Sequence, residues 1–457
     1  MAFNEQAIED FLTLGYVIEP KSIFKNIYKI PAGHYVLVDK HTENIATKPY
    51  WEIKDFFAEK TTLDKKKLLE LMNDSVQNRM ISDVPLGAFL SGGLDSTLIV
   101  ALMSEHSPNK INTCSIGFDL SKYDESSFAE LAAKELDTEH STTSVSVNDL
   151  SLVDLLVDVF GEPFADNSAI PTLILSKTTR SRVKVALSGD GSDELFFGYR
   201  NYQMLNFEER IRKIMPGFLR QPIFTFLAKV YPRLNNAPRF LRAKSTLASL
   251  SQDSITSHHN SMSLADKHTI ESLYSVSFKA KLKNYSSLTS FKKIASEVKH
   301  HSALKQVQYV DFKTYLPSDI LTKVDRASMA DSLEVRVPFL DHKVVEYGVS
   351  LAPAVNIKGS KVKVALVKAF KHILPKFVIE RKKMGFTAPI DEWIRQIPID
   401  TLEKRLLSEP LLSQNIFNVL HLKQLIIDHH KRKRDNGELI WALLILEAFF
   451  RKNNPKK

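Results

Sequence analysis

Two glycine-rich stretches of the sequence carry hydroxyl and acidic side chains in a pattern that could bind phosphate and a metal ion. The first loop consists of Ser91, Gly92, Gly93, Leu94, Asp95 and Ser96. It follows a short apolar run at residues 86–90 and opens a helical pattern at residues 96–105. Glycines let backbone N–H groups approach an anion, and a helix N-terminus adds partial positive charge. This pattern predicts a turn that binds phosphate.

An acidic residue inside this turn changes the expected chemistry. No Gly-Lys-Ser or Gly-Lys-Thr follows, so the first loop is not a Walker loop. The carboxylate of Asp95 would repel phosphate unless a cation lay between them, and Mg²⁺ bridging carboxylate and phosphate oxygens removes the conflict. The alternative is a glycine-rich turn between a strand and a helix, in which Asp95 only caps the helix.

The second loop, residues 188–194, repeats these features after another apolar run at residues 183–187. It reads Ser188, Gly189, Asp190, Gly191, Ser192, Asp193 and Glu194. Because the carboxyl ends of parallel strands meet at one edge of a sheet, the two loops are expected to face one another. Asp95 and Asp193 could then both ligate Mg²⁺. Helix capping would explain one of the acidic residues in the second loop, but not all three.

The elements expected around these loops indicate an α/β fold. Strands are expected at residues 86–90, 111–118, 140–147 and 183–187, and helices at 65–80, 96–105, 126–136, 150–160 and 172–182. This alternation is typical of a parallel sheet with crossover helices. We expect three parts: an appendage at residues 1–60, an α/β core at 61–215, and a mostly helical part at 216–457.

Composition narrows the possible partners and location. The 457 residues carry a net charge of +9, which favours an anionic partner such as a nucleotide. The densest basic run, residues 429–434, is interpreted as a solvated helix end, so nucleic acid is not expected as a partner. The single cysteine, Cys114, excludes an intrachain disulfide and suits the cytoplasm. No apolar run could span a bilayer and no secretory signal is visible, so no membrane partner is expected.

The first loop, in its context from residue 82, resembles the pyrophosphate loop of N-type ATP pyrophosphatases (the PP-loop superfamily). More narrowly, residues 15–447 resemble the synthetase half of the glutamine-hydrolysing asparagine synthetases. The resemblance rests on blocks that follow one another in the family's order, at residues 15–17, 31–34, 82–96, 123–126, 162–166, 188–194, 321–330, 334–341 and 381–386.

The resemblance implies roles for individual residues. Leu90, Ile116, Ser188 and Gly189 would hold the adenosine part of ATP, the first loop its pyrophosphate, and Asp95 and Asp193 the Mg²⁺. Lys383 matches the family's catalytic lysine, and Asp190 matches an acidic position that faces the acyl-adenylate and the incoming ammonia. Two interpretations stay open for four charged residues, which could form a structural salt-bridge network or contact the substrate directly. These residues are Asp325, Arg326, Glu334 and Arg336.

The implied activity is that of an ATP-dependent, AMP-forming ligase. It would adenylate a carboxylate, by default that of aspartate, release pyrophosphate, and let ammonia attack to give the amide. Full-length relatives begin with a glutaminase domain whose nucleophile is an N-terminal cysteine, whereas Ala2 follows Met1 here and Cys114 lies in an expected strand. We therefore expect no glutaminase activity from this chain alone. Its nitrogen would come from free ammonia or a separate glutaminase partner docking on residues 1–51, unless the chain is a truncated product of a longer gene.

Other functions compete with this one. The same core could act on another carboxylate, such as a sugar acid or a peptide, in an amidase- or cyclase-type ligase. The basic charge also suggests a tRNA-modifying member of the loop superfamily, but the C-terminal blocks argue against it. A non-catalytic ATP-binding fragment is the third alternative, and the presence of Asp95, Asp193 and Lys383 together opposes it.

Overall fold

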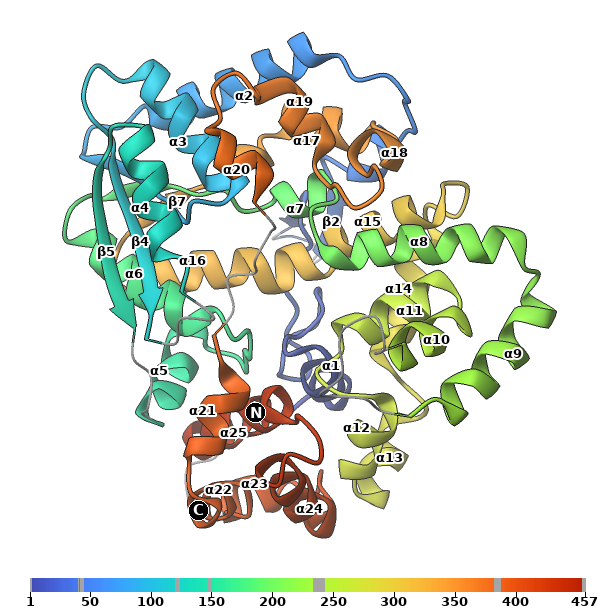
Figure 1. Cartoon of the computed structure of the whole chain (residues 1–457). Helices are drawn as coiled ribbons and strands as arrows, with labels where there is room; N and C mark the ends of the chain where they lie inside the picture. The colour runs from blue at the N-terminus through green and yellow to red at the C-terminus, as the bar shows by residue number, and fades with distance from the viewer. Residues whose placement is uncertain are drawn as a thin grey trace.

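A five-stranded parallel sheet carries both predicted loops. The computed structural model describes residues 2–39, 41, 45–119, 124–145, 150–232, 243–381 and 388–453. The sheet has the order β5-β4-β3-β6-β7. Figure 1 shows β5 and β4 side by side at one edge of the molecule. Its strands are β3 (Leu86–Phe89), β4 (Asn112–Phe118), β5 (Glu139–Val145), β6 (Val185–Leu187) and β7 (Glu334–Arg336). The α/β fold with a parallel sheet is therefore confirmed.

Four of these strands lie where the sequence predicted them, and the fifth was missed. β7 pairs in parallel with β6, and Glu334 lies opposite Val185. The sequence predicts a mostly helical part from residue 216 and gives no strand signal there. β7 has only three residues, and two of them are charged, as is common on the edge of a sheet. It therefore lacks the apolar run by which the other strands were recognised.

Crossover helices flank the sheet at nearly the predicted bounds. They are α3 (Leu94–His106), α4 (Ser126–Glu135), α5 (Ser151–Phe160) and α6 (Ala169–Arg180), and α2 (Lys65–Met80) precedes the first strand and packs on α3. α2 begins where predicted because the Asp64 carboxylate accepts a hydrogen bond from the Lys67 N–H at 3.0 Å and so caps the helix. α4 and α6 contact β4 and β5, and α3 contacts β3. The start of α3 thus lies directly beyond the end of β3, where the first loop is.

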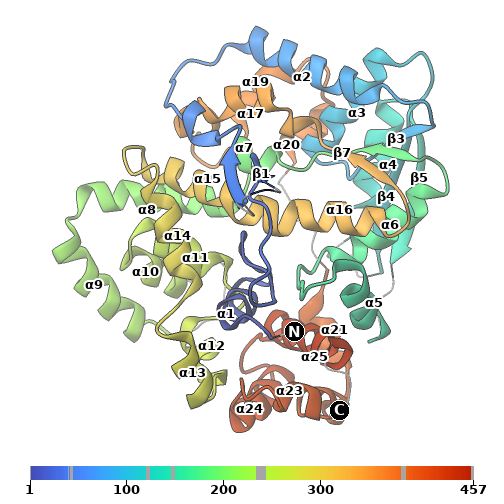
Figure 2. The same cartoon turned by 180° about the vertical axis from the view of Figure 1, so that it is seen from behind.

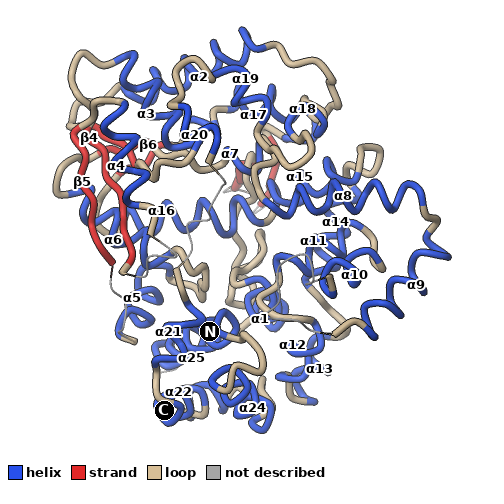
Figure 3. The backbone as a smooth tube through the Cα atoms, viewed as in Figure 1, coloured by secondary structure: helices blue, strands red, loops and turns tan. Residues whose placement is uncertain are grey.

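The rest of the chain is largely helical, as predicted (Figure 3). A short α7 (Ser192–Leu195) begins within the second loop, and η3 (Leu316–Leu321) runs directly into α16 (Thr322–Met329). The other elements of this part are α8 (Arg200–Ile214), α9 (Gly217–Val230), α10 (Lys244–Leu250), α11 (Ser254–Met262), α12 (Lys267–Leu273), α13 (Val276–Leu282), α14 (Ser287–Ser296), α15 (Ala303–Lys313), η4 (Pro338–Leu340), α17 (His342–Val349), α18 (Pro353–Asn356), α19 (Val364–Phe370), α20 (Lys376–Glu380), α21 (Ile390–Gln396), α22 (Ile399–Leu406), α23 (Glu409–Leu412), α24 (Val419–His430) and α25 (Gly437–Asn453).

The N-terminal segment divides into a buried helix and an exposed hairpin, followed by η1 (Ile53–Phe56). α1 (Glu5–Leu14) buries Phe11 and Leu12 completely and packs against α25 near the other end of the chain (Figure 2). The antiparallel hairpin β1 (His34–Val38) and β2 (Ile45–Pro49) instead exposes large apolar side chains, among them Ile45. The division into three parts at residues 60 and 215 remains a prediction.

Throughout the part of the chain that the structure describes, no helix has both the length and the apolar character needed to cross a bilayer.

Candidate functional site

The two predicted loops lie side by side at the carboxyl ends of neighbouring strands. β3 and β6 pair in parallel, with Ala88 opposite Leu187, so both chains leave the sheet at the same edge. The Ser192 hydroxyl of the second loop donates a hydrogen bond to Asp95 Oδ1 at 2.7 Å. A Cβ atom on Gly189 would lie 2.9 Å from the Ser96 nitrogen. The prediction that the loops face one another is confirmed, and this contact leaves no room for a side chain at residue 189.

The first loop is a tight turn that ends at the N-terminus of α3. The Ser91 N–H donates to Ser96 Oγ at 3.1 Å, and the Gly93 N–H donates to Ser91 Oγ at 3.3 Å. Gly92 has φ of +68°, and a Cβ atom there would overlap the backbone of Phe128. The turn therefore places backbone N–H groups and two hydroxyls at the start of a 13-residue helix, the arrangement expected for binding an anion.

The two predicted metal ligands converge on one cation, the ammonium group of Lys363. Its Nζ lies 2.6 Å from both carboxylate oxygens of Asp95 and 2.7 Å from Asp193 Oδ1. Only 2% of the lysine side chain is exposed. Burial lowers the pKa of Lys363, but the carboxylates of Asp193 and Asp95 outweigh this effect, so its pKa is raised and the ammonium stays charged.

Sequence reasoning missed Lys363, although the structure places it at the centre of the site. Its backbone has φ of +51°, at the residue that precedes the first turn of α19. On the opposite side, a Cβ atom on Gly198 would overlap both Asp193 Oδ1 and Lys363 Cε. The absence of a side chain at residue 198 thus lets the lysine reach Asp193.

The same carboxylates fit Mg²⁺. Asp95 and Asp193 together offer four oxygen atoms at the edge of a phosphate-type turn, and Mg²⁺ prefers a few carboxylates combined with phosphate oxygens. Their convergence on a single ammonium shows that they can share one cation. Lys363 occupies the position between them.

Asp190, the predicted ammonia-facing residue, is held by Ser188. Its N–H donates to Ser188 Oγ at 3.2 Å, and the Ser188 hydroxyl donates back to the Asp190 carboxylate. Burial raises the pKa of Asp190, and the positive charge of Lys323 opposes that rise. Lys323 Nζ in turn lies 2.8 Å from Asp166 Oδ2 and from Ser168 Oγ. Sequence reasoning did not single out Lys323, although it lies in the block at residues 321–330.

More buried acidic groups surround this lysine. Burial raises the pKa of Asp166, but Lys323 outweighs burial and holds that pKa below its ordinary value. Burial and the charge on Asp166 raise the pKa of Asp319 well above its ordinary value. Burial and the neighbouring Asp193 raise the pKa of Glu194 to about 7, while its Oε1 accepts a hydrogen bond from Tyr199 Oη at 2.6 Å. Several carboxyl groups near the second loop therefore resist ionisation.

The four residues predicted to hold adenosine gather at the ends of neighbouring strands. Leu90 and Ile116 are 1% and 6% exposed, and the Leu90 N–H donates to Cys114 O at 2.9 Å between β3 and β4. Ser188 is buried beyond β6, next to Gly189. Cys114 itself is buried within β4, as the sequence suggested, and burial raises the pKa of its thiol.

Comparison with known proteins identifies the family to which this site belongs. A family model described as asparagine synthase matches residues 67–451. The chain belongs to the asparagine synthase family. A glutamine-hydrolysing asparagine synthetase of Bacillus subtilis is 30% identical over 99% of this chain and 70% of its own length. A putative asparagine synthetase of Mycobacterium tuberculosis is 28% identical over 97% of this chain and 66% of its own length.

An amidase of Penicillium rubens is also similar, with 24% identity over 82% of this chain and 60% of its own length. The chain thus spans about two thirds of the length of these relatives. Membership of the asparagine synthase family supports an ATP-dependent, amide-forming ligase.

The residue predicted from the resemblance to be the catalytic lysine lies outside the described part of the chain. Lys383 falls at residues 382–387, which lie outside the described residues. Arg381, directly before them, contacts the first loop: its guanidinium donates to Gly92 O at 3.2 Å, pairs with Glu125 and stacks 3.9 Å from the ring centre of Phe128.

The charged residues for which two interpretations were open form two local ion pairs. Asp325 and Arg326 are 3.5 Å apart, with mostly exposed side chains, whereas Glu334 and Arg336 are 2.6 Å apart. Arg336 also donates to the carbonyl oxygens of Arg79 and Ile81, which ties β7 to the end of α2. The contacts of Arg336 support a structural role for this second pair.

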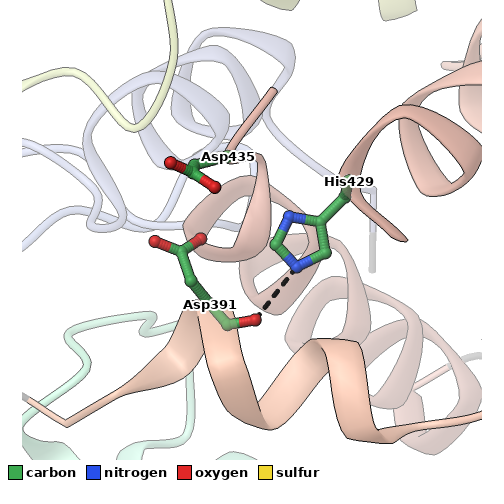
Figure 4. Close-up of side chains that lie close together, drawn as sticks. All are labelled: Asp391, His429 and Asp435. Atoms are coloured by element: carbon green, nitrogen blue, oxygen red, sulfur yellow. Dashed lines mark hydrogen bonds between the residues drawn. The ribbon is translucent and has the colours of Figure 1, made fainter. Parts of the chain in front are cut away.

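A second cluster of possible metal ligands has its polar atoms engaged within the protein (Figure 4). His429 Nε2 lies 3.1 Å from Asp391 O, and its Nδ1 accepts from the Asn436 N–H at 3.0 Å. Asp391 Oδ1 accepts from the Gly437 N–H at 3.0 Å, and Asp435 pairs with Arg395. Because both ring nitrogens of His429 already have hydrogen-bond partners, we interpret this cluster as a set of polar contacts that connects α21, α24 and α25.

Proposed function

We propose that this chain uses ATP and Mg²⁺ to adenylate a carboxylate and then forms an amide with ammonia. The observation that carries the proposal is the convergence of Asp95 and Asp193 on one cation, between two glycine-rich loops at the ends of β3 and β6. Such a site can bind a nucleotide's phosphates and place positive charge beside them.

The proposed reaction has two steps. A substrate carboxylate oxygen attacks the α-phosphorus of ATP, and the bond to pyrophosphate breaks. Ammonia then attacks the acyl carbon, the bond to AMP breaks, and a proton leaves the nitrogen. The first loop would hold the pyrophosphate through its N–H groups and through Ser91 and Ser96, so that the leaving group is oriented before the attack. When bound by Asp95 and Asp193, Mg²⁺ would supply charge to the phosphate oxygens.

Two side chains complete the proposed chemistry. Asp190, held by Ser188, would accept the proton of the attacking ammonia, and its raised pKa makes it a better base than an ordinary aspartate. Lys383 would stabilise negative charge on the α-phosphoryl group. Its assignment rests on the family resemblance and on the contact of nearby Arg381 with the first loop.

Aspartate is the proposed acceptor, which would make the product asparagine. The similarity to the asparagine synthetases of Bacillus and Mycobacterium favours it. The similarity to a fungal amidase is weaker and keeps another carboxylate, such as a sugar acid or a peptide, as the second candidate.

We propose a cytoplasmic enzyme without glutaminase activity in this chain, supplied by free ammonia or by a separate glutaminase. The exposed apolar side chains of the β1–β2 hairpin, among them Leu37 and Ile45, offer a surface for such a partner. A Leu37→Ser, Ile45→Ser variant should keep its activity with ammonia and lose any stimulation by the partner. Equal stimulation of variant and wild type would reject this surface.

The experiment that tests the function is pyrophosphate release from ATP and Mg²⁺, with ammonia present and a panel of carboxylates. We expect release with aspartate, and a loss of at least about 100-fold in Asp95→Asn. Asp74→Asn, in an exposed position on α2, removes the same charge away from the site and should retain activity. Unchanged turnover in Asp95→Asn would refute the metal role. No release with any carboxylate would favour a non-catalytic ATP-binding protein.

A further inference from the structure

The entire net charge of the chain resides in one segment. Residues 210–252 contain nine basic residues and no aspartate or glutamate, while the remainder has 53 residues of each sign. The basic residues are Arg210, Arg212, Lys213, Arg220, Lys229, Arg233, Arg239, Arg242 and Lys244. The densest basic run, at residues 429–434, is therefore not the main source of the charge asymmetry.

The same segment contains a helix that turns its apolar side to the solvent. In α9, Arg220 is the buried residue and fixes one side of the helix by donating to the carbonyl oxygens of Leu250 and Gln252. The adjoining half of the helix exposes six large apolar side chains, namely Phe218, Leu219, Ile223, Phe226, Leu227 and Val230. At 100° per residue these six lie within one half of the helix surface.

The position of α9 leaves this face open. α9 packs along α10, and in both views it lies at the periphery of the molecule, far from the sheet (Figures 1 and 2). Phe218 and Phe226 are 75% and 65% exposed, and Ile214, just before the helix, is 84% exposed. An apolar face of this kind on a folded protein marks an interaction surface.

Basic side chains accompany the apolar face. Lys229 is exposed at the carboxyl end of α9, and Arg210 and Lys213 are exposed near the end of α8, the helix that precedes it. An amphipathic helix with an apolar face and basic flanks is the arrangement that lies in the interface of an anionic bilayer. We propose that α9 binds this protein peripherally to anionic lipid surfaces, with the six side chains entering the interface and the lysines contacting the headgroups.

Charge and chemistry favour lipid over the other possible occupants. A second copy would bring two equally basic segments together, so they would repel each other. A nucleic acid would not require Phe, Leu and Ile at the centre of the surface, because phosphate is bound by basic and polar side chains. A bilayer accommodates both the apolar centre and the basic flanks. With 14 residues, α9 is about 21 Å long, so it would lie along the surface rather than cross it.

The test is flotation of the full chain with vesicles of phosphatidylcholine, with and without about 30% phosphatidylserine. We expect binding to the anionic vesicles that is at least about tenfold stronger than to the neutral ones and that weakens with salt. Phe218→Ser with Phe226→Ser should reduce binding at least about tenfold. Leu420→Ser, at a 77% exposed position on α24, should leave it unchanged.

Charge reversal provides an independent arm. Lys213→Glu with Lys229→Glu should weaken binding by more than about tenfold, whereas Lys371→Glu with Lys423→Glu, two exposed lysines elsewhere, should not. All of these side chains are exposed, so thermal melting should confirm that every variant folds.

Three results would overturn the proposal. One is the absence of binding to anionic vesicles. Another is vesicle binding that the phenylalanine substitutions leave unchanged and only the charge reversals weaken, as expected for a nucleic-acid surface. The third is lipid-independent self-association that Phe226→Ser abolishes.

Discussion

Replacing Lys363 by methionine should destabilise the protein in a way that Mg²⁺ repairs. Methionine keeps much of the apolar stem but removes the ammonium that lies 2.6 Å from Asp95 and 2.7 Å from Asp193. Two carboxylates whose side chains are about one fifth exposed then face one another without a cation. Water cannot fully replace the lost partner at this depth.

The expected size of the effect follows from the geometry. With both carboxylates on one ammonium, the negative charges are about 5 Å apart, and an effective dielectric constant of about 20 gives a repulsion of about 3 kcal/mol. Breaking a buried ion pair costs about 3–5 kcal/mol in measured cases. For a chain of 457 residues the unfolding entropy is about 1 kcal/mol per degree, so Tm should fall by about 3–5 °C.

The assay is thermal melting without ATP, at low and at millimolar Mg²⁺. Mg²⁺ should raise the Tm of Lys363→Met more than that of the wild type, because in the variant no ammonium group competes with the divalent ion for the two carboxylates. Lys361→Met, at an exposed position two residues earlier, is the matched control and should melt like the wild type. A Tm for Lys363→Met equal to that control, or a deficit that Mg²⁺ leaves unchanged, would refute the reasoning.

Three further predictions test the surroundings of this ion pair. Gly198→Ala should cost about as much stability as Lys363→Met, because its Cβ atom would overlap the Lys363 side chain. The double variant should lose less stability in thermal melting than the two single variants lose together. Full additivity of the two losses would contradict this prediction. Folding raises the pKa of Glu194 from 4.5 to about 7, so the unfolded chain loses this proton at lower pH than the folded protein does. As pH rises from about 4.5 to about 7, this group therefore lowers the free energy of unfolding progressively. Glu194→Gln should therefore gain up to about 3 kcal/mol relative to wild type between pH 4 and pH 8 in denaturant titrations, and a constant difference would count against it. Lys323→Met should raise the pKa of Asp190 further and move the acidic limb of the pH–rate profile to higher pH. Lys323→Arg should keep this limb at its wild-type position. A limb that does not move in Lys323→Met would argue against Asp190 as the base.

The sheet and the facing loops could be predicted because their signals are local. An apolar run followed by a glycine-rich turn and a helical pattern identifies a strand, its end and the helix that follows. Once the strands are parallel, their carboxyl ends must share an edge, which brings Asp95 and Asp193 together although they are far apart in sequence. β7 escaped because three residues at a charged edge give no such run.

Lys363 could not be found in the same way. It pairs with Asp95 across 268 residues, and nothing in its neighbourhood distinguishes it from the other lysines and arginines, which number 62 in all. The blocks that carried the family resemblance ended at residue 341 and resumed at 381. A pairing that depends on tertiary packing alone is not visible in the local periodicity of the sequence. The exposed face of α9 could not be predicted either, because an apolar stripe on a helix by itself predicts burial.

The contact between α1 and α25 can form only after almost the whole chain has been synthesised. α1 buries Phe11 and Leu12 partly against the last helix, which begins at Gly437. About 420 residues separate the two helices, and at about 5–20 residues per second their synthesis takes roughly 20–90 s. α12, α13 and α14, which also contact α1, are made earlier, but for that time the side of α1 that faces α25 lacks its partner. A ribosome-bound chain should therefore present this side to chaperones, and α1 completes its packing only when α25 has been made.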